Sequence, residues 1–521
     1  SFFKTLKFFK RLFNIAKITL VVSLKRGLTG PQRLRTFFER AGGGFIKFGQ
    51  ILALRQDFIP PSYANELLKL LSAAPEIPFI EMHKVFIKEM GEPVGKFFAE
   101  FDATPVASAS MAQVYEAQLP AEAGGSKVAV KIQRPGIKEV FEADFLIISF
   151  FAGLIDFFRF FTVITAAEVA SDFIGWTRRE LDFRHESRNA MAFYEYSRGS
   201  DQTIIPIQYP EMTTSKVLVQ EFIENGVLVE DIILGKIQKD ELLKKNIDLE
   251  LASRYLIKEG MKQYFVDGFF HADPHPANLM LLPGNKLAFL DFGIVGESKE
   301  TRLILLKFVY GAAIRDIEYM SRHLMEFGRK VFEGEIEIYL QTDITKHGAV
   351  SRVFDKIKDI ILEDFKKEVE AIMKPWFEAL DNKNSSLLEK SSAMVFFKLI
   401  RKAGKYGVHF PREIILFFRG LAIDDMVALQ MSPDFDIMKA MNSFFKEYPL
   451  GEVEELIKNE TDARRKEIDE KIASVTDDWE EFVEISAAHK EKMLAARERV
   501  MELVAYYAEK YPEVMSLIKN L

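Results

Sequence analysis

The stretch that decides the fold is His271-Ala272-Asp273-Pro274-His275-Pro276-Ala277-Asn278, which Asp291-Phe292-Gly293 follows a short distance along the chain. Asn278 lies five residues after Asp273, and Asp291 lies thirteen residues after Asn278. Taken singly, each of these short motifs occurs by chance in many loops and turns. Their order and spacing carry the signal, because they place two carboxylates and an amide around one short connecting segment.

That connecting segment predicts a hairpin, with strands over residues 279–282 and 287–290 joined by a Pro-Gly-Asn turn. Phosphoryl transfer needs a carboxylate near the acceptor hydroxyl or water and oxygen ligands for Mg²⁺. Asp273 suits the first role, and Asn278 with Asp291 suits the second. The same order and spacing occur in the catalytic loop and the metal-binding loop of protein kinases.

A third requirement, a cation near the nucleotide phosphates, is met by Lys131 in Val128-Ala129-Val130-Lys131. This lysine falls on the second of two predicted strands, over residues 114–119 and 127–133, which a Gly-containing turn joins into a hairpin. A lysine on a strand keeps its position where a carboxylate holds it. Glu186, in a predicted helical segment, is the leading candidate for that carboxylate.

Three more motifs extend the pattern. They are Lys47-Phe48-Gly49-Gln50 ahead of the first hairpin, Ala107-Ser108-Ala109 in place of a Gly-x-Gly-x-x-Gly loop, and Glu180-Leu181-Asp182. With these motifs the chain resembles the UbiB-like atypical kinases, an aarF-domain family associated with ubiquinone and other prenyl-lipid metabolism. The resemblance covers residues 40–300 and continues more weakly to about residue 435.

The resemblance implies a kinase-like fold that binds Mg-ATP, with Asp273 in the catalytic-loop position. Lys131 would contact the phosphates and pair with Glu186, and Asn278 and Asp291 would hold the metal. The nucleotide-binding positions implied for the Ala-rich loop, and for the hinge from which the adenine would hang, are Ala107, Ser108, Ala109, Ser110, Glu221 and Ile223.

In this family the Lys-x-Gly-Gln segment folds over the active site and restricts access by protein substrates. The resemblance therefore implies that Lys47 and Gln50 lie near Glu180 and Asp182. A cation that enters the pocket there pairs with those carboxylates and helps to organise the phosphates. Protein-substrate kinase activity is accordingly disfavoured.

The predicted fold is α+β and bilobal, in a protein-kinase-like arrangement. A small N-lobe holds an antiparallel sheet, the C-lobe is mainly helical, and helical extensions occur at both ends. Further strands are predicted over residues 203–209 and 216–223. The predicted segments are a basic amphipathic helical segment (1–40), an extension with the Lys-x-Gly-Gln motif (41–96), the N-lobe with a helical insertion (97–224), the C-lobe (225–445) and charged helices (446–521).

Composition excludes several classes of protein. The chain has 521 residues, a formal net charge of −7 and no cysteine. The lack of cysteine excludes disulfides, zinc–thiolate sites and Cys nucleophiles, and the net negative charge argues against a nucleic-acid binder. A transition-metal interpretation of His271-x-Asp273-x-His275 is a rival hypothesis, although it leaves Lys131, Glu186 and Asp291 unexplained.

Residues 1–40 differ from the rest, because ten basic residues and one acid give them a net charge of +9 and leave −16 on the remainder. The apolar residues near one face of a predicted helix over residues 2–24 are Phe2, Leu6, Phe9, Phe13 and Leu20. Two interpretations stay open. The helix lies in an anionic membrane interface, or it packs on its own protein with its basic face in solvent.

The most apolar long stretch, residues 145–165, is interrupted by Asp156 and Arg159, so we expect a largely buried helix there rather than a membrane span. The first residues do not resemble a secretory signal. The chain begins with Ser1 rather than Met, which is consistent both with removal of a targeting segment and with trimming of the chain. The expected location is a prokaryotic cytoplasm or membrane surface, or the interior of a mitochondrion or plastid.

The sequence thus predicts a Mg-ATP-binding atypical kinase or ATPase that supports prenyl-quinone or other lipid metabolism at a membrane surface. Its expected cofactors are ATP and Mg²⁺, and its expected partners are a lipid or prenyl-quinone-like small molecule and a peripheral membrane contact. The alternative is a nucleotide-regulated lipid-binding scaffold or chaperone, a pseudokinase without significant phosphoryl transfer. A third possibility is a structural membrane-surface protein with a degenerate site.

Overall fold

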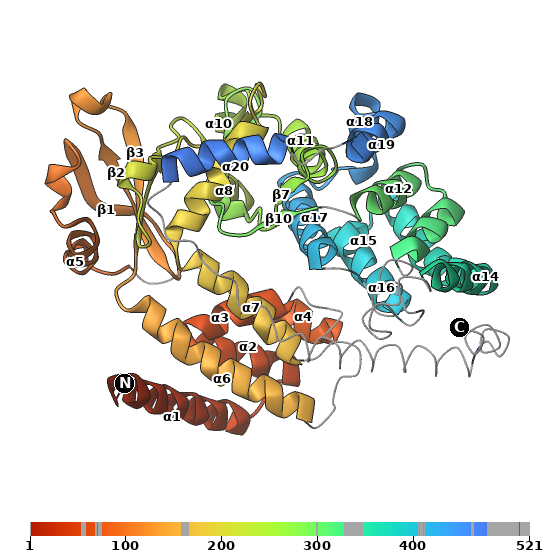
Figure 1. The fold of residues 1–521 in the computed structure, drawn as a ribbon, viewed down its shortest axis with the longest axis horizontal. Coiled ribbons are helices and arrows are strands. Elements are labelled where there is room, and N and C mark those ends of the chain that lie inside the picture. Colours follow the sequence, from red (N-terminus) through yellow and green to blue (C-terminus); the bar gives the residue numbers. More distant parts are fainter. Residues whose placement is uncertain are drawn as a thin grey trace.

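The computed structural model describes residues 2–53, 59–67, 70, 76–157, 166–298, 301–327, 347–404, 406, 410, 412–459, 463–476 and 510. These residues form a small lobe built on a β-sheet and a larger lobe built mainly from helices (Figure 1). A layer of helices from the first part of the chain lies below both lobes in Figure 1, and its buried residues share one hydrophobic cluster with those of the larger lobe.

The sheet of the small lobe has four antiparallel strands in the order β1-β2-β3-β5. The strands are β1 (Glu100–Ser108), β2 (Ala112–Gln118), β3 (Lys127–Gln133) and β5 (Val217–Glu221). Helix α5 (Phe79–Met90) covers one face, where Met82 and Phe86 are fully buried with Val128 and Val130. The strands expected at 114–119 and 127–133 correspond to β2 and β3. Strand β1 was not predicted, because Pro105 and the polar residues around it obscure the alternation.

The larger lobe carries two small sheets, ordered β4-β9-β8-β6 and β10-β7. Their strands are β4 (Thr203–Ile204), β6 (Val227–Leu228), β7 (Phe269–His271), β8 (Leu279–Leu282), β9 (Lys286–Phe289) and β10 (Val295–Glu297). The hairpin predicted after Asn278 is β8–β9. The strand expected over 203–209 is wrong in length, because it ends at Ile204, shortly before Pro206, which has no N–H to donate.

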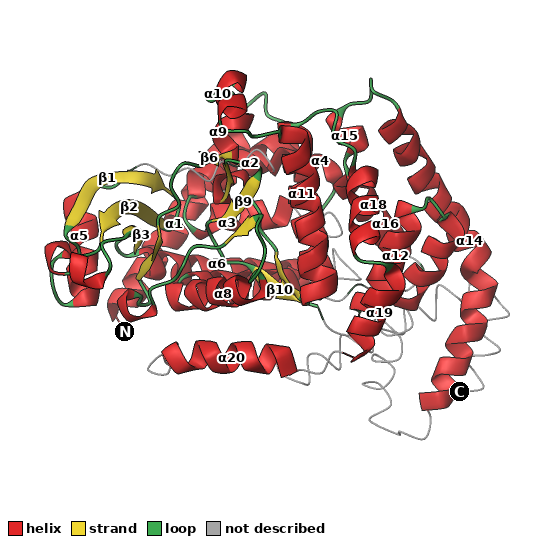
Figure 2. Cartoon of the chain, turned by 90° about the horizontal axis from the view of Figure 1, so that it is seen from above, coloured by secondary structure: helices red, strands yellow, loops and turns green. Residues whose placement is uncertain are grey.

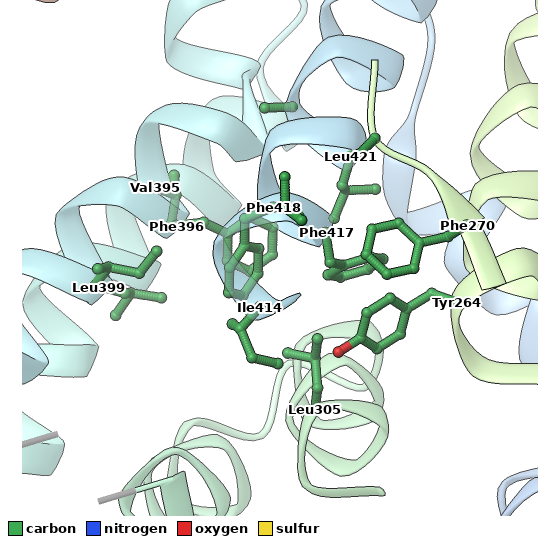
Figure 3. Close-up of a cluster of buried hydrophobic side chains, with 14 of the residues drawn as sticks. Tyr264, Phe270, Leu305, Val395, Phe396, Leu399, Ile414, Phe417, Phe418 and Leu421 are labelled. Carbon is green, nitrogen blue, oxygen red and sulfur yellow. The ribbon is translucent and has the colours of Figure 1, made fainter. Parts of the chain in front are cut away.

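The helices of the larger lobe pack around α17 (Arg412–Met431) (Figure 3). The ring centres of Phe417 and Tyr264 are 4.0 Å apart, and those of Phe418 and Phe396 are 4.7 Å apart. Aromatic contacts on both sides of α17 make it a rigid support. The helices are α9 (Val229–Ile233), α10 (Lys239–Lys244), α11 (Leu249–Lys262), α12 (Arg302–Ala313), a helix over 317–327, α14 (His347–Asp381), α15 (Leu387–Lys390), α16 (Ser392–Gly404), α17 (Arg412–Met431), α18 (Ile437–Glu447), α19 (Leu450–Asn459) and α20 (Ala463–Thr476).

The helices of the layer below both lobes in Figure 1 are α1 (Phe2–Leu24), α2 (Gly30–Ala41), α3 (Gly44–Ala53), α4 (Pro61–Leu67), α6 (Ile137–Phe157) and α7 (Ala166–Glu180). Helix α8 (Phe183–Tyr196) then leads back to the sheet. One buried ion pair ties three of these helices together. Arg11 on α1 donates from Nε to Asp144 Oδ1 of α6 at 2.6 Å, and Asp144 Oδ2 accepts the N–H of Gly44 at the start of α3.

The expectation of a largely buried helix over 145–165 holds for one face of α6 only; residues 158–165 lie outside the described residues. Phe145, Ile147, Ile148 and Ala152 are buried. On the other face Leu146, Phe150 and Leu154 recur every four residues and are 60%, 65% and 42% exposed. Helix α6 packs on α1, α3 and α7, and its second apolar face lies outside these contacts and stays exposed to solvent.

Helix α20 lies across α8, as Figures 1 and 2 show. Lys471 contacts Glu195 of α8 at 3.2 Å, and Arg465 contacts Glu297 of β10 at 3.0 Å. Ile468 is buried in the same cluster as residues of α8 and β7. Helix α20 therefore covers the larger lobe with Ile468 and pairs its Arg465 and Lys471 with acidic residues of that surface.

Candidate active site

The centre of the candidate site is Lys131, which lies on β3 between β2 and β5. Its Nζ contacts both carboxylate oxygens of Glu186 on α8 at 2.8 Å and Asp291 Oδ2 at 2.7 Å. Residues from a strand of the small lobe, a helix and a loop of the larger lobe thus meet at one lysine. The expected pairing of Lys131 with Glu186 is present in the structure, and Asp291 joins it.

Burial shapes the ionisation of this triad. Burial by itself lowers the pKa of Lys131, but the carboxylates of Asp291 and Glu186 outweigh it and raise the pKa above its usual value. Burial and the neighbouring Asp291 charge raise the pKa of Glu186 to about 7, although Lys131 opposes this. Burial acts to raise the pKa of Asp291 as well. The positive charge of Lys131 and the hydrogen bond from the Gly293 N–H outweigh this effect and hold the pKa of Asp291 well below its usual value. One cation faces two carboxylates, so the site has a surplus of negative charge.

The loop that carries Asp273 follows β7 and is held by the imidazole ring of His271. Its Nδ1 accepts the Asp273 N–H at 3.1 Å, so Nε2 carries the proton and donates to the Asp291 carbonyl at 2.6 Å. Burial lowers the pKa of His271, which keeps the ring neutral. The Asn278 carbonyl accepts the Leu290 N–H at 2.9 Å, so Asn278 lies beside Asp291. The hairpin β8–β9 is the reason that residues thirteen positions apart meet here.

Asp273 has a partner from a distant part of the chain. Arg419 Nη2, on α17, lies 3.1 Å from Asp273 Oδ1. Gly420 allows this close approach, because a Cβ at that position would lie 2.8 Å from the His271 carbonyl oxygen. The carboxylate of Asp273 is therefore fixed from the larger lobe, whereas the backbone of its loop is fixed by His271.

Lys47 of α3 reaches the same region, where its Nζ forms an ion pair with Glu180 Oε2. A Cβ on Gly293 would lie 3.4 Å from Glu180 Oε1, so Glu180 packs directly over the loop that follows Asp291. Burial raises the pKa of Glu180, while Lys47 opposes this shift. The Lys-x-Gly-Gln helix is thereby joined to the loop after Asp291 through one carboxylate.

Of the contacts expected where Lys47 and Gln50 lie near Glu180 and Asp182, the structure shows the ion pair of Lys47 with Glu180, and it shows further partners for Asp182 and Gln50. Asp182 is the N-cap residue of α8, where its side chain accepts the Arg184 N–H, and its carboxylate also binds the Arg184 guanidinium at 2.6 Å. Gln50 donates from Nε2 to the Leu70 carbonyl at 3.3 Å. The Asp182 carboxylate thus starts a helix and carries its own cation, a role that a pattern of acidic residues alone does not reveal.

The Ala-rich loop follows β1, and Ala109 donates its N–H to the Ala112 carbonyl at 2.9 Å. Ser108 pairs with Gln113 and Lys131 with Val114, so the loop and Lys131 lie at the same end of the sheet. In the structure Ala107 and Ser108 end β1, and Ala109 and Ser110 form the turn. The hinge positions lie at the end of β5, where Glu221 is the last strand residue and Ile223 comes two residues later.

Two arginines of the site were not predicted. Arg134 donates from Nε to the Ala109 carbonyl at 2.7 Å and from Nη2 to Ser108 Oγ at 2.8 Å, so it supports the Ala-rich loop. The sequence could have indicated Arg134, because it lies directly after β3. Nothing in the sequence indicates Arg419, because no motif surrounds it and its partner lies far away in the chain.

The transition-metal hypothesis for His271-x-Asp273-x-His275 is wrong for this structure. Both ring nitrogens of His271 are engaged by backbone groups, and His275 Nδ1 lies within reach of the Ala277 N–H. In the part of the chain that the structure describes, no three His, Asp or Glu side chains converge as such a site requires. Phe292 is fully buried against Phe193 of α8, which joins the Asp291-Phe292-Gly293 loop to that helix.

A sheet lobe and a helical lobe with this lysine–glutamate pair and these two loops define a protein-kinase-like fold. Comparison with known proteins narrows the class. The ABC1 atypical kinase-like domain matches residues 69–324. A Synechocystis protein of uncharacterised function is 30% identical over 344 residues, which cover 64% of this chain and 80% of that protein. The chain belongs to the ABC1, or UbiB-like, family of atypical kinases.

Named relatives agree with this assignment. A probable protein kinase UbiB from Marinobacter nauticus is 28% identical over 81% of this chain and 70% of its own length. The chloroplastic protein ACTIVITY OF BC1 COMPLEX KINASE 3 from Arabidopsis thaliana is 29% identical over 79% of this chain, which spans only 52% of that relative.

Among solved structures, the Rv3197–erythromycin complex from Mycobacterium tuberculosis is 27% identical, with a TM-score of 0.41. The match covers 58% of this chain and 75% of that chain.

Among the helices that the structure describes, none combines the length and the apolar character needed to cross a membrane.

Proposed function

We propose that this protein is a Mg-ATP-dependent atypical kinase or ATPase that works in prenyl-quinone or other lipid metabolism at a membrane surface. The observation that carries the proposal is the triad of Lys131, Glu186 and Asp291, next to a loop that presents Asp273. A kinase-type site needs this lysine–glutamate pair and the metal-binding aspartate in place together.

The residues present suit a divalent cation. The triad holds one lysine against two carboxylates, one of them buried (Glu186) and one partly exposed (Asp291), and Asn278, whose amide oxygen is a hard ligand, lies beside Asp291. Asn278 and Asp291 would hold Mg²⁺, which supplies charge neutralisation on the nucleotide phosphates when bound. Lys131 would bind phosphate oxygens, and Asp273 would orient the attacking hydroxyl or water.

The Lys47 ion pair supports a preference for ATP hydrolysis or a small acceptor over protein substrates. Lys47 enters the site from α3 and engages Glu180, which packs over Gly293. An extended peptide would have to displace this buried ion pair, whereas water or a small hydroxyl compound would not. Breaking a buried pair is costly, on the order of 3–5 kcal/mol when one partner is left alone.

The test of the nucleotide site is the thermal shift on adding ATP with and without Mg²⁺, because a ligand that binds the folded state raises its apparent stability. We expect a Mg²⁺-dependent shift in the native chain and its loss in Asp291→Asn. The control is Asp381→Asn, which removes an exposed ion pair with Arg315 and should leave the shift unchanged. No shift in the native chain would refute the nucleotide site.

Turnover separates the enzyme from a nucleotide-regulated scaffold. If Asp273 takes part in phosphoryl transfer, Asp273→Asn should retain Mg-ATP binding and lose phosphate release about a hundredfold or more. Equal phosphate release by the two forms, or none by either, would favour the scaffold. Lipid extraction from vesicles, measured on both proteins, then shows whether the scaffold role depends on Asp273.

The membrane part of the proposal rests on exposed apolar side chains beside basic ones. On α1 one face packs on the protein through Ile15 and Val22, which are buried. The predicted face carries Phe9, Phe13 and Leu20, which are 60%, 74% and 61% exposed. The exposed lysines Lys10 and Lys17 flank Phe13 at helical spacing, and the neighbouring helix α6 adds its own exposed apolar face. This combination suits the interface of an anionic bilayer.

Co-flotation with vesicles of anionic phospholipid tests the contact. We expect Phe9→Ser/Phe13→Ser to reduce the bound fraction several-fold, since each removes apolar surface that the bilayer would bury. The matched control is Leu234→Ser/Leu243→Ser, which changes two side chains that are 60% and 66% exposed elsewhere. Equal binding by both variants would contradict the assignment of this face.

A further inference from the structure

Arg419 holds an unusual position in the larger lobe. It lies on α17 between Phe418 and Gly420, is only 8% exposed and contacts Asp273 through Nη2. Its Nε and Nη1 are also buried, and neither has a hydrogen-bond partner among the described residues. A buried guanidinium with one ion pair and two unmatched donors is a net cost to folding, because desolvation is not repaid.

Asp273, the partner of Arg419, remains partly exposed to solvent. The Asp273 side chain is 29% exposed, against 10% for that of Arg419. Removal of Arg419 would therefore leave a carboxylate that water can still solvate, rather than an isolated buried charge. Stability gives no reason to keep the arginine, and its contact with Asp273 is the feature that remains to be explained.

The support beneath Arg419 is rigid. Phe417 and Phe418 anchor α17 in the aromatic cluster of Figure 3, and Gly420 packs against the His271 carbonyl. The guanidinium therefore meets the catalytic loop in one fixed register. Catalytic groups need to be held within fractions of an ångström, and second contacts of this kind provide that constraint.

We propose that Arg419 is a positioning residue for phosphoryl transfer, which fixes the orientation of the Asp273 carboxylate from α17. This inference rests on the proposed function, because it requires that Asp273 act in turnover. Arg419 itself need not touch the nucleotide. Its effect should appear in kcat and only through Asp273, with little change in ATP affinity or in folding.

A double-mutant cycle tests this on the full chain, with Arg419→Met, Arg419→Lys, Asp273→Asn and the Arg419→Met/Asp273→Asn double variant. We expect Arg419→Met to lower kcat about tenfold or more. The KM for ATP should stay within about twofold and Tm should be unchanged or higher, because an unsatisfied cation is removed. Arg419→Lys should restore part of kcat. In the Asp273→Asn background, Arg419→Met should have no further effect, since coupled residues are not additive.

The outcomes distinguish the inference from the proposed function. Lys258→Met is the control, because it breaks the Lys258–Glu447 ion pair of the same lobe outside the site and should leave kcat unchanged. An unchanged kcat in Arg419→Met, an additive effect in the cycle, or a loss that follows a fall in Tm would overturn the positioning role while ATP turnover stands. A native chain that releases no phosphate would overturn the proposed turnover and this role together.

Discussion

Glu186 has a pKa that burial and the neighbouring Asp291 charge raise to about 7. A folded-state pKa above the unfolded value contributes stability at low pH, which is lost as pH rises through about 7. We therefore expect Glu186→Gln to reduce the fall in Tm between about pH 5.5 and about pH 8. Glu89→Gln is the control, because the ion pair with Lys216 helps to lower the Glu89 pKa despite burial. Glu89→Gln should therefore not reduce the fall in Tm between these two pH values.

Lys47 and Glu180 form a second coupled pair, and both side chains are largely buried, at 17% and 11% exposure. Lys47→Met should lower stability by about 3–5 kcal/mol near pH 8, because Glu180 is left as an uncompensated buried charge. Burial raises the Glu180 pKa, so protonation relieves this cost and the loss should shrink toward about pH 5.5. Urea unfolding of Lys47→Met and of the native chain at both pH values measures this loss of stability.

The double variant Lys47→Met/Glu180→Gln should recover most of that stability, because it removes both charges. Lys84→Met serves as a comparison, since it breaks an exposed pair with Glu81, and such pairs contribute about 1 kcal/mol or less. A loss in Lys47→Met that is the same at both pH values would contradict the account of Glu180.

At the scale of elements, the junction of α1, α3 and α6 depends on Gly43. This residue has a φ of +56°, and a Cβ there would lie 2.9 Å from Asp144 Oδ2. Gly43→Ala should therefore destabilise the protein by about 1–3 kcal/mol more than Gly27→Ala, by overpacking against the buried ion pair. Gly27 also has a positive φ, but a Cβ there meets open space. Chemical unfolding of both variants gives the difference, and equal losses would show that backbone strain alone matters.

At the scale of the whole molecule, charge is divided between the ends of the chain. Residues 1–40 carry +9 and the remainder carries −16. An anionic bilayer should attract the first part and repel the rest, which would turn α1 toward the membrane. Raising the salt concentration from about 0.05 M to about 0.5 M should weaken co-flotation with anionic vesicles, because it screens exposed charges. Binding that does not depend on salt would indicate apolar contact alone.

The sequence by itself identified Lys131, Asp273, Asn278 and Asp291 as the residues of the candidate site. Three of these residues lie within a short segment, and a hairpin between two loops brings its ends together regardless of the rest of the fold. Strands β2 and β3 were predictable for the same local reason, since their alternation is visible within seven residues. The family assignment followed from the order of such local motifs.

Only the tertiary structure decided what surrounds those residues. The contact of Arg419 with Asp273 joins positions far apart in the chain, and no pattern in the sequence connects them. The same is true of Arg11 with Asp144, and of the second apolar face of α6, whose exposure depends on which helices lie beside it. Local patterns specify which groups a segment presents, and packing between distant segments specifies which of those groups meet.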